Sequence, residues 1–272
     1  MHDVIRKITK KRKIIVHFHI FKNAGCTIDY IMRNNFHKHY FSYDNPGQSY
    51  FISGNEGIEY IYKNPAMKVF SSHQLLYPLP EDSNLTVYSI FLLRHPIDRI
   101  GSIYRFEKKH LSFTQSSLKA KVMDFKEYVL WKLDNGGKTM RNFHVHRLSY
   151  PGNGDITTFR KRLLTNKELD TAKGRLKNSG YFGIVERFDD SLLLMKDYLQ
   201  KDFPDIDYSY VIQNKSTDIE NIEQRLYMIR EQLGAQLYEN LLKINDLDIE
   251  LYNYALNIFK NRIESIGVEN NV

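Results

Sequence analysis

Two apolar segments, each leading through a short polar loop into a helical pattern, constrain the fold most. Residues 14–20 are β-branched and aromatic, which predicts a strand that is covered on both faces. After a polar loop, the next apolar residues recur at helical spacing: Ile28, Ile31 and Met32. Residues 87–93 form a second buried run, and Pro96 is suited to the first turn of a following helix. Strands that alternate with helices predict a parallel α/β sheet.

The rest of the chain extends this pattern. Residues 68–71 and 181–185 are further strand candidates, and residues 108–180 show mainly helical spacing. Residues 41–65 are rich in Ser, Asn, Gly and Tyr, which predicts an irregular insertion. After residue 188, amphipathic stripes predict a helical C-terminal part. We therefore expect an α/β fold with a central parallel sheet flanked by helices.

Composition limits the class of protein. The chain has 272 residues, and we expect a single domain over 1–272 with a basic lead-in at 1–13. No apolar run approaches the roughly 20 residues that span a bilayer, so we expect no transmembrane segment. Cys26 is the only cysteine, which excludes a disulfide within the chain and favours a cytoplasmic location. The net charge of +7 suggests an anionic partner.

The first loop has the features of an anion cradle. The amides at a helix N-terminus attract anions, and Gly25 lets the backbone approach one closely. Lys22 adds a cation and Thr27 a hydroxyl donor. A Walker A loop places Gly-Lys-Ser/Thr at its end, whereas here the lysine precedes the small residues. An ordinary βα turn with a surface lysine is the alternative interpretation.

The second loop places a guanidinium group at the carboxyl end of a buried strand. Ligands of open α/β sheets bind at that end, and Arg94 offers a fork that suits a phosphate. Ser102 adds a hydroxyl from the following helix, whereas Asp98 and Arg99 are expected to form a local ion pair. Two anion sites on one sheet edge suit a nucleotide with phosphates at both ends of its ribose.

The two loops resemble those of a known family. Residues 20–27 resemble the 5′-phosphosulfate loop of sulfotransferases that use 3′-phosphoadenosine 5′-phosphosulfate (PAPS), and residues 91–102 resemble their 3′-phosphate loop. The resemblance is closest to the heparan and chondroitin sulfate O-sulfotransferases and their bacterial relatives. Weaker likenesses lie at 181–188, 214–216 and 246–252. The chain departs from the family pattern at Phe21, where proline is common, and at Cys26, where Ser or Thr is usual.

The resemblance implies a P-loop-like architecture and transfer of a sulfuryl group from PAPS to an acceptor, without a metal. Lys22 would neutralise charge on the oxygen that leaves sulfur. The 5′-phosphosulfate would be held by the backbone of the first loop: Asn23, Ala24, Gly25, Cys26 and Thr27. The 3′-phosphate would be held by residues of two loops: Arg94, Ser102, Lys215 and Ser216. The expected partners are the nucleotide and an acceptor hydroxyl on a saccharide, lipid-linked saccharide or small natural product, and not a nucleic acid.

A general base is expected near the acceptor. Histidine titrates near neutral pH, and His73 closes the strand at 68–71, where related glycan enzymes carry a histidine. Glu56 and Glu59 are the weaker candidates. By the same resemblance, three polar residues lie near the acceptor: Asn142, His144 and Arg147.

Other interpretations stay open. A P-loop kinase would require Mg-ATP, and a basic α/β scaffold can bind nucleic acid with steep salt dependence. If residues 17–19 and 144–146 are strands, each places two histidines on one face, but we expect no nearby carboxylate to complete a zinc site. Cys26 is interpreted as a small packing residue rather than a phosphatase nucleophile, because position 32 holds Met32 and not the arginine of a Cys-x5-Arg motif.

Overall fold

A parallel sheet forms the centre of the molecule. The computed structural model describes residues 11–44, 51–111, 113–151, 162–212, 219 and 221–267. Four strands lie in the order β2–β3–β1–β4, all parallel: β1 (Arg12–Phe18), β2 (Tyr40–Ser42), β3 (Val69–Ser72) and β4 (Leu85–Ile90). The last five residues of β1 are buried, which confirms the prediction of a strand covered on both faces.

The strand predicted over 87–93 is divided in two. β4 ends at Ile90, and after Phe91 the chain continues as β5 (Leu92–Leu93). β4 pairs with β1, whereas β5 pairs in parallel with β6 (Gly183–Ile184), because the chain changes partner at Phe91. The Phe91 carbonyl accepts a hydrogen bond of 2.9 Å from Gly183 N, so the two sheets are continuous at this point.

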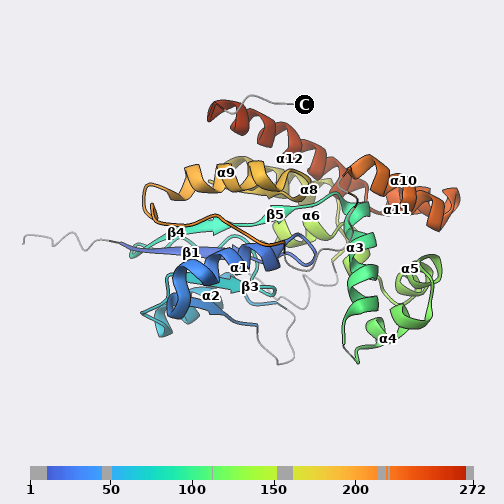
Figure 1. Ribbon diagram of the computed structural model, residues 1–272, viewed down its shortest axis with the longest axis horizontal. Helices are drawn as coiled ribbons and strands as arrows, with labels where there is room; N and C mark the ends of the chain where they lie inside the picture. The colour runs from blue at the N-terminus through green and yellow to red at the C-terminus, as the bar shows by residue number, and fades with distance from the viewer. Residues whose placement is uncertain are drawn as a thin grey trace, which may run out of the picture.

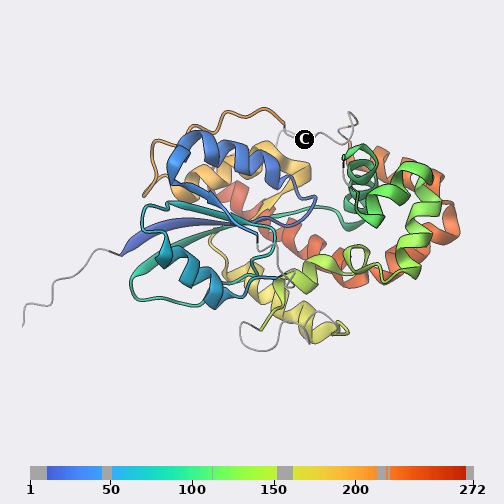
Figure 2. The ribbon, with the colours of Figure 1, turned by 90° about the horizontal axis from the view of Figure 1, so that it is seen from below.

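Helices cover both faces of the sheet. Figure 2 shows α1 (Gly25–Phe36) and α9 (Phe188–Leu199) on one side, with α2 (Gly54–Lys63) and α8 (Asn166–Asn178) on the other. The long α12 (Asp246–Ser265) packs on α8 and along β6 (Figure 1). Apolar residues from these elements form the main core, which includes Ile15, Phe70, Ile184 and Leu251.

A helical lobe extends from one end of the sheet and has its own core. It contains α3 (Pro96–Lys109), α4 (Gln115–Val122), α5 (Phe125–Asp134), α10 (Ile222–Leu233) and α11 (Ala235–Ile244). Its fully buried residues include Ile100, Tyr128, Val129 and Leu241. Short elements complete the described chain: η1 (His37–His39), η2 (Lys138–Met140), α6 (Phe143–Leu148) and η3 (Val185–Arg187). Within the described residues, no helix is both long and apolar enough to cross a membrane.

The prediction of an irregular insertion over 41–65 is wrong for its second half, which contains α2. Ser53 and Glu56 form a capping box at the start of this helix. Gly57 lowers the intrinsic helix propensity, but a Cβ there would lie 2.7 Å from Leu75 Cδ1. Close packing against Leu75 therefore explains why glycine occupies a helical position.

The segment 144–146 is helical and not a strand. Asp248 of α12 accepts hydrogen bonds from the backbone amides of His144 (2.9 Å) and Val145 (2.8 Å) in the first turn of α6. These amides have no partner within the helix, so the distant carboxylate fixes where α6 begins. The local sequence contains no signal for this contact, because Asp248 lies on another element.

Candidate active site

The loop after β1 is tightly constrained. Lys22 and Ala24 adopt left-handed backbone conformations, with φ of 65° and 58°. A Cβ at Gly25, the first residue of α1, would lie 2.2 Å from His19 Cδ2, so a larger residue cannot occupy this position unless the imidazole moves. The first amides of α1 are therefore presented close to the ring of His19, which supports the predicted anion cradle.

A buried polar chain holds this loop in place. Asn23 Nδ2 donates to the Leu92 carbonyl at 2.6 Å and to His144 Nε2 at 2.9 Å. His144 Nδ1 lies 3.3 Å from the carboxylate of Asp248. The Asn23 side chain therefore anchors the loop instead of facing the cavity. The backbone amide of Asn23 donates to the Ile20 carbonyl at 3.2 Å, so it is also engaged within the protein.

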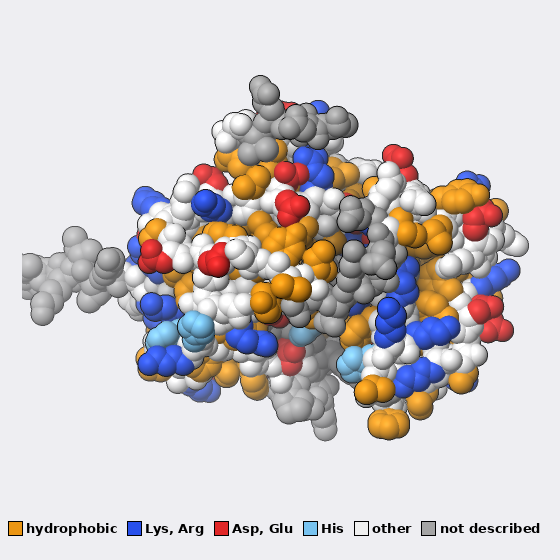
Figure 3. Space-filling view, viewed as in Figure 1, with side chains coloured by type: hydrophobic (Ala, Val, Ile, Leu, Met, Phe, Trp, Pro, Cys, Tyr) orange, Lys and Arg blue, Asp and Glu red, His pale blue; other side chains and the backbone are white. Residues whose placement is uncertain are grey.

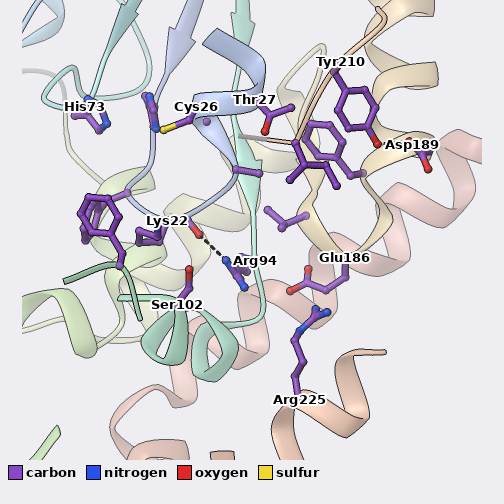
Figure 4. Close-up of a pocket in the computed structure, with 18 of the residues that line it drawn as sticks. Lys22, Cys26, Thr27, His73, Arg94, Ser102, Glu186, Asp189, Tyr210 and Arg225 are labelled. Carbon is purple, nitrogen blue, oxygen red and sulfur yellow. Dashed lines mark hydrogen bonds between the residues drawn. The ribbon is translucent and has the colours of Figure 1, made fainter. Parts of the chain in front are cut away.

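Arg94 connects the two predicted loops directly. Its Nε and Nη2 each lie 2.8 Å from Asp98 Oδ2, and its Nη1 donates to the Lys22 carbonyl at 3.2 Å (Figure 4). The expected ion pair between Asp98 and Arg99 is wrong, because Asp98 lies one helical turn after Arg94 and binds that residue. Arg99 is buried and instead donates to the Thr139 carbonyl.

Positive charge around this contact exceeds negative charge. Asp98 Oδ1 lies 3.2 Å from Arg225 and 3.7 Å from Arg105, so three guanidinium groups share this buried carboxylate. Among the described residues, no carboxylate forms an ion pair with Lys22, whose Nζ lies 4.2 Å above the ring of Phe106. An anionic ligand would balance this charge, and an arrangement of this kind is typical of phosphate sites.

Burial changes the proton affinity of two groups near this contact. Burial lowers the pKa of Lys22 to about 8; Cys26 opposes this shift, whereas the charges of Arg94 and Arg105 add to it. Burial raises the pKa of Glu186, whose carboxylate accepts a hydrogen bond from His95 N at 2.9 Å and from Tyr252 at 2.9 Å. Both oxygens of the Glu186 carboxylate therefore accept hydrogen bonds from residues of the protein.

A cavity of about 460 Å³ opens between the two loops. Its size lies within the usual range for cofactor sites. Figure 4 shows Lys22, Arg94 and Ser102 close together, with Arg225 and Glu186 further along the same cavity. Other predicted donors also line it: Ala24, Gly25, Cys26 and Thr27. Aromatic side chains supply an apolar part: Phe21, Phe106, Phe188 and Tyr210.

His73 lies where two cavities meet. This half-exposed histidine lines the first cavity and also a second cavity of about 540 Å³. Asp44 Oδ2 accepts from His73 Nδ1 at 3.0 Å, and Asp44 Oδ1 accepts from His73 N at 2.8 Å. The ring stacks on His19 with a centroid distance of 3.7 Å. His73 Nε2 is therefore the nitrogen that remains to accept a proton.

Asp44 is ionised in this arrangement. Partial burial opposes its charge, but hydrogen bonds from His73 and Ser72 outweigh burial and lower the pKa of Asp44 to about 2. Glu56 and Glu59 lie on α2, where Glu56 closes the capping box and Glu59 lies 3.8 Å from Lys63. Neither glutamate lines the two cavities.

The structure corrects the expectation that no carboxylate accompanies His17 and His19. Asp29 of α1 accepts from His17 Nδ1 and His19 Nδ1, each at 2.8 Å, and the Ser71 hydroxyl also donates to it at 2.6 Å. Burial opposes the charge of Asp29, but the two imidazoles lower its pKa far below the usual range. Burial lowers the pKa of His19 to about 4, so its ring is neutral near pH 7.

The second cavity lies beside the first and is cationic. It is lined by Lys138, Arg141, Arg147 and Arg162, together with the rings of Phe51, Phe143 and His146. Among the described lining residues there is no carboxylate. Arg147 is buried and donates to the carbonyls of His73 and Leu75, whereas Lys138 and Arg141 are exposed.

The remaining residues that the sequence assigned to the site lie in different places. Asn142 lines the second cavity with Arg147, whereas His144 is buried beneath the first loop and lines neither cavity. Cys26 is exposed and lines the first cavity, so it is not a packing residue. Lys215 and Ser216 lie outside the described residues.

Sequence reasoning missed four residues of this region: Asp29, Asp44, Arg105 and Arg225. Arg105 follows Ser102 by three residues on α3, so helical spacing could have placed it on the same face. The two aspartates lie far along the chain from the histidines that they bind, and no local pattern indicates these pairs.

Comparison with known proteins gives a consistent result. A family model described as "Sulfotransferase family" matches residues 6–255 of the chain. An uncharacterized protein of Archaeoglobus fulgidus is 31% identical over 257 residues, which cover 92% of this chain and 98% of the archaeal protein. The family match includes both loops, the described strands and the first half of α12. The parallel sheet and the family match agree, and the chain belongs to the sulfotransferase family.

Proposed function

We propose that this sulfotransferase uses PAPS as its donor and transfers the sulfuryl group to a hydroxyl of a saccharide or glycoconjugate, with a small natural product as a further possible acceptor. The observation that carries the donor assignment is the contact between Arg94 and the Lys22 carbonyl. This contact brings two cationic loops to the same cavity. PAPS has an anionic group at each end of its ribose, and the two loops match this distribution.

The residues present fit such a nucleotide. Lys22 and the backbone of residues 24–27 would bind the 5′ side, and Arg94 with Ser102 would bind the 3′-phosphate. Asn23, which the sequence also placed here, would hold the loop in shape. We assign Lys215 and Ser216 to the same phosphate, on the basis of the sequence resemblance alone. When bound, PAPS supplies an electrophilic sulfuryl group on its 5′-phosphate. Lys22 would stabilise the negative charge that develops on that side of the cavity.

His73 is proposed as the general base. Asp44 accepts a hydrogen bond from Nδ1–H, which keeps the proton on Nδ1 and leaves the Nε2 lone pair for the acceptor hydroxyl. The position of His73 between the two cavities supports this role, because the base must reach the acceptor hydroxyl at the point where that hydroxyl meets the donor. The stacked ring of His19 limits the orientations that His73 can adopt.

The second cavity is proposed as the acceptor site. Sugar rings pack well on aromatic faces such as those of Phe51 and Phe143, and Lys138 and Arg141 would favour an acidic saccharide. We propose a cytoplasmic location because the lone Cys26 does not indicate an oxidising compartment.

Nucleotide binding distinguishes this proposal from a kinase. We expect adenosine 3′,5′-bisphosphate to bind without Mg²⁺ and Mg-ATP to bind at least about tenfold more weakly, as measured by calorimetry. Arg94→Ala removes a charged, forked donor and should weaken bisphosphate binding by about 10- to 100-fold. Arg187→Ala is the matched control, because Arg187 is exposed and pairs with Asp190.

A preference for Mg-ATP would contradict the donor assignment and favour a phosphotransferase. Binding of oligonucleotides that weakens steeply with salt, with no preference for the bisphosphate, would favour a nucleic-acid-binding function.

Bisphosphate affinity should also depend on pH. The pKa of Lys22 is lowered to about 8, so its ammonium group loses its proton as the pH rises through that value. We expect Kd to be constant between about pH 7 and pH 8, where both phosphates are ionised, and to rise by up to about tenfold per pH unit above pH 8. Lys22→Met should bind weakly at every pH and lack this dependence.

Lys196→Met is the control for the pH series, because Lys196 is exposed on α9 and does not line the cavity. If Lys22→Met kept the full pH dependence of the wild type, another group would be responsible and the role of Lys22 would be refuted.

Measurements of turnover test the role of His73 as the general base. With labelled PAPS and an acceptor found by screening saccharides, His73→Ala should lower kcat by about 10²- to 10⁴-fold while bisphosphate affinity stays within about twofold. Added imidazole should restore part of the activity, which a structural role would not allow. Asp44→Asn should lower kcat by a smaller factor, because it disturbs only the orientation of His73. Glu59→Gln is the control, and unchanged turnover of His73→Ala would remove His73 from the mechanism.

A further inference from the structure

The turn between α3 and α4 exposes large apolar side chains. Leu111 is 93% exposed and Phe113 is 90% exposed, although both belong to residue types that usually pack inside proteins. On α4, Val122 is 80% exposed and follows Leu118, which is 47% exposed, at a spacing of four residues. These two side chains share one face of the helix. We call Leu111, Phe113, Leu118 and Val122 the apolar tip.

Lysines surround the apolar tip. Lys108 and Lys109 are in the last turn of α3, and Lys119 and Lys121 lie on α4. The sequence of residues 108–122 contains four lysines and one histidine and no acidic residue. In Figure 3, Lys and Arg side chains gather over the corner formed by α3 and α4, and hydrophobic side chains form its outermost edge.

The turn is held by specific contacts. Ser117 is buried, and its hydroxyl donates to the carbonyls of Glu107 (2.9 Å) and His110 (3.2 Å). Thr114 caps α4 by accepting from Ser117 N at 3.2 Å. Tyr104, within α3, donates to the carbonyl of Met123, the residue that follows α4, at 2.9 Å and thereby joins the two helices a second time. The apolar side chains therefore lie on two helices that hydrogen bonds hold together.

We propose that the apolar tip is a membrane-binding surface that inserts Leu111 and Phe113 among the headgroups of an anionic lipid bilayer. An exposed apolar tip gains free energy when its side chains leave water for the interface. Lysines close to an anionic surface add an attraction that salt weakens. A protein partner would not require that every charged residue of 108–122 be basic, so the charge pattern favours lipid.

This surface lies close to the active site. Ser102 in the first cavity and Lys109 beside the tip belong to α3, and their separation of seven positions corresponds to a rise of about 10 Å along the helix. A protein bound through its tip would hold the cavity near the headgroups. If the proposed function is correct, this position favours a lipid-linked acceptor over a free one.

Vesicle binding tests the proposal. We expect the whole protein to co-sediment with vesicles of phosphatidylcholine and phosphatidylglycerol, and to bind pure phosphatidylcholine at least about tenfold more weakly. Leu111→Ser with Phe113→Ser should weaken binding by about tenfold or more, and so should Lys108→Gln with Lys109→Gln. The matched control is Leu193→Ser with Lys196→Gln, which changes an exposed leucine and lysine on α9.

A fluorescent probe tests insertion itself. Phe113→Trp should show a blue shift of emission on adding the anionic vesicles, whereas the wild type, whose tryptophan is Trp131, should not. Bisphosphate affinity measured in the absence of lipid should be the same for all tip variants, which shows that they fold and separates this proposal from the proposed function.

Vesicle binding that is equal for neutral and anionic lipid would overturn the proposal. Binding that the tip variants leave unchanged would do the same. Self-association of the wild type that the tip variants abolish, without vesicle binding, would assign the surface to a protein interface instead.

Discussion

The candidate site depends on the contacts of the Arg94 guanidinium group. It binds Asp98 within its own loop and the Lys22 carbonyl in the other loop. The contact is possible because β1 and β4 are adjacent parallel strands, so the loop after β1 and the β5 segment that follows β4 lie at the same end of the sheet. The Asn23 side chain strengthens the connection, because it donates to the Leu92 carbonyl at the end of the second strand.

Charge explains why this region is suited to an anion. Asp98 faces three guanidinium groups, and Lys22 contributes a further cation whose pKa is depressed to about 8 by burial and by its neighbours. Bringing like charges together is unfavourable in the free protein. A doubly anionic nucleotide would relieve this repulsion, so the free energy stored in the cluster would contribute to affinity. The same reasoning applies more weakly to the second cavity, whose cations are partly exposed.

The parts of this site that follow local rules were predictable from the sequence. The strand at 14–20 and the loop containing Lys22 and Gly25 form one contiguous segment, and the pattern of burial and helical spacing indicates both. Contacts between distant segments were not predictable. Asp44 reaches His73 across neighbouring strands, and Asp248 fixes the start of α6 from a separate helix. Gly57 lies in a helix because of packing on Leu75, which local propensity does not encode.

The central claim is that the two cationic loops bind one nucleotide. A crystal structure of the protein with adenosine 3′,5′-bisphosphate tests it most directly. The account predicts a single bisphosphate in the first cavity, with one phosphate bound at Lys22 and the first turn of α1 and the other at Arg94 and Ser102. A bisphosphate bound elsewhere, or one that contacts Lys22 or Arg94 but not both, would contradict the account.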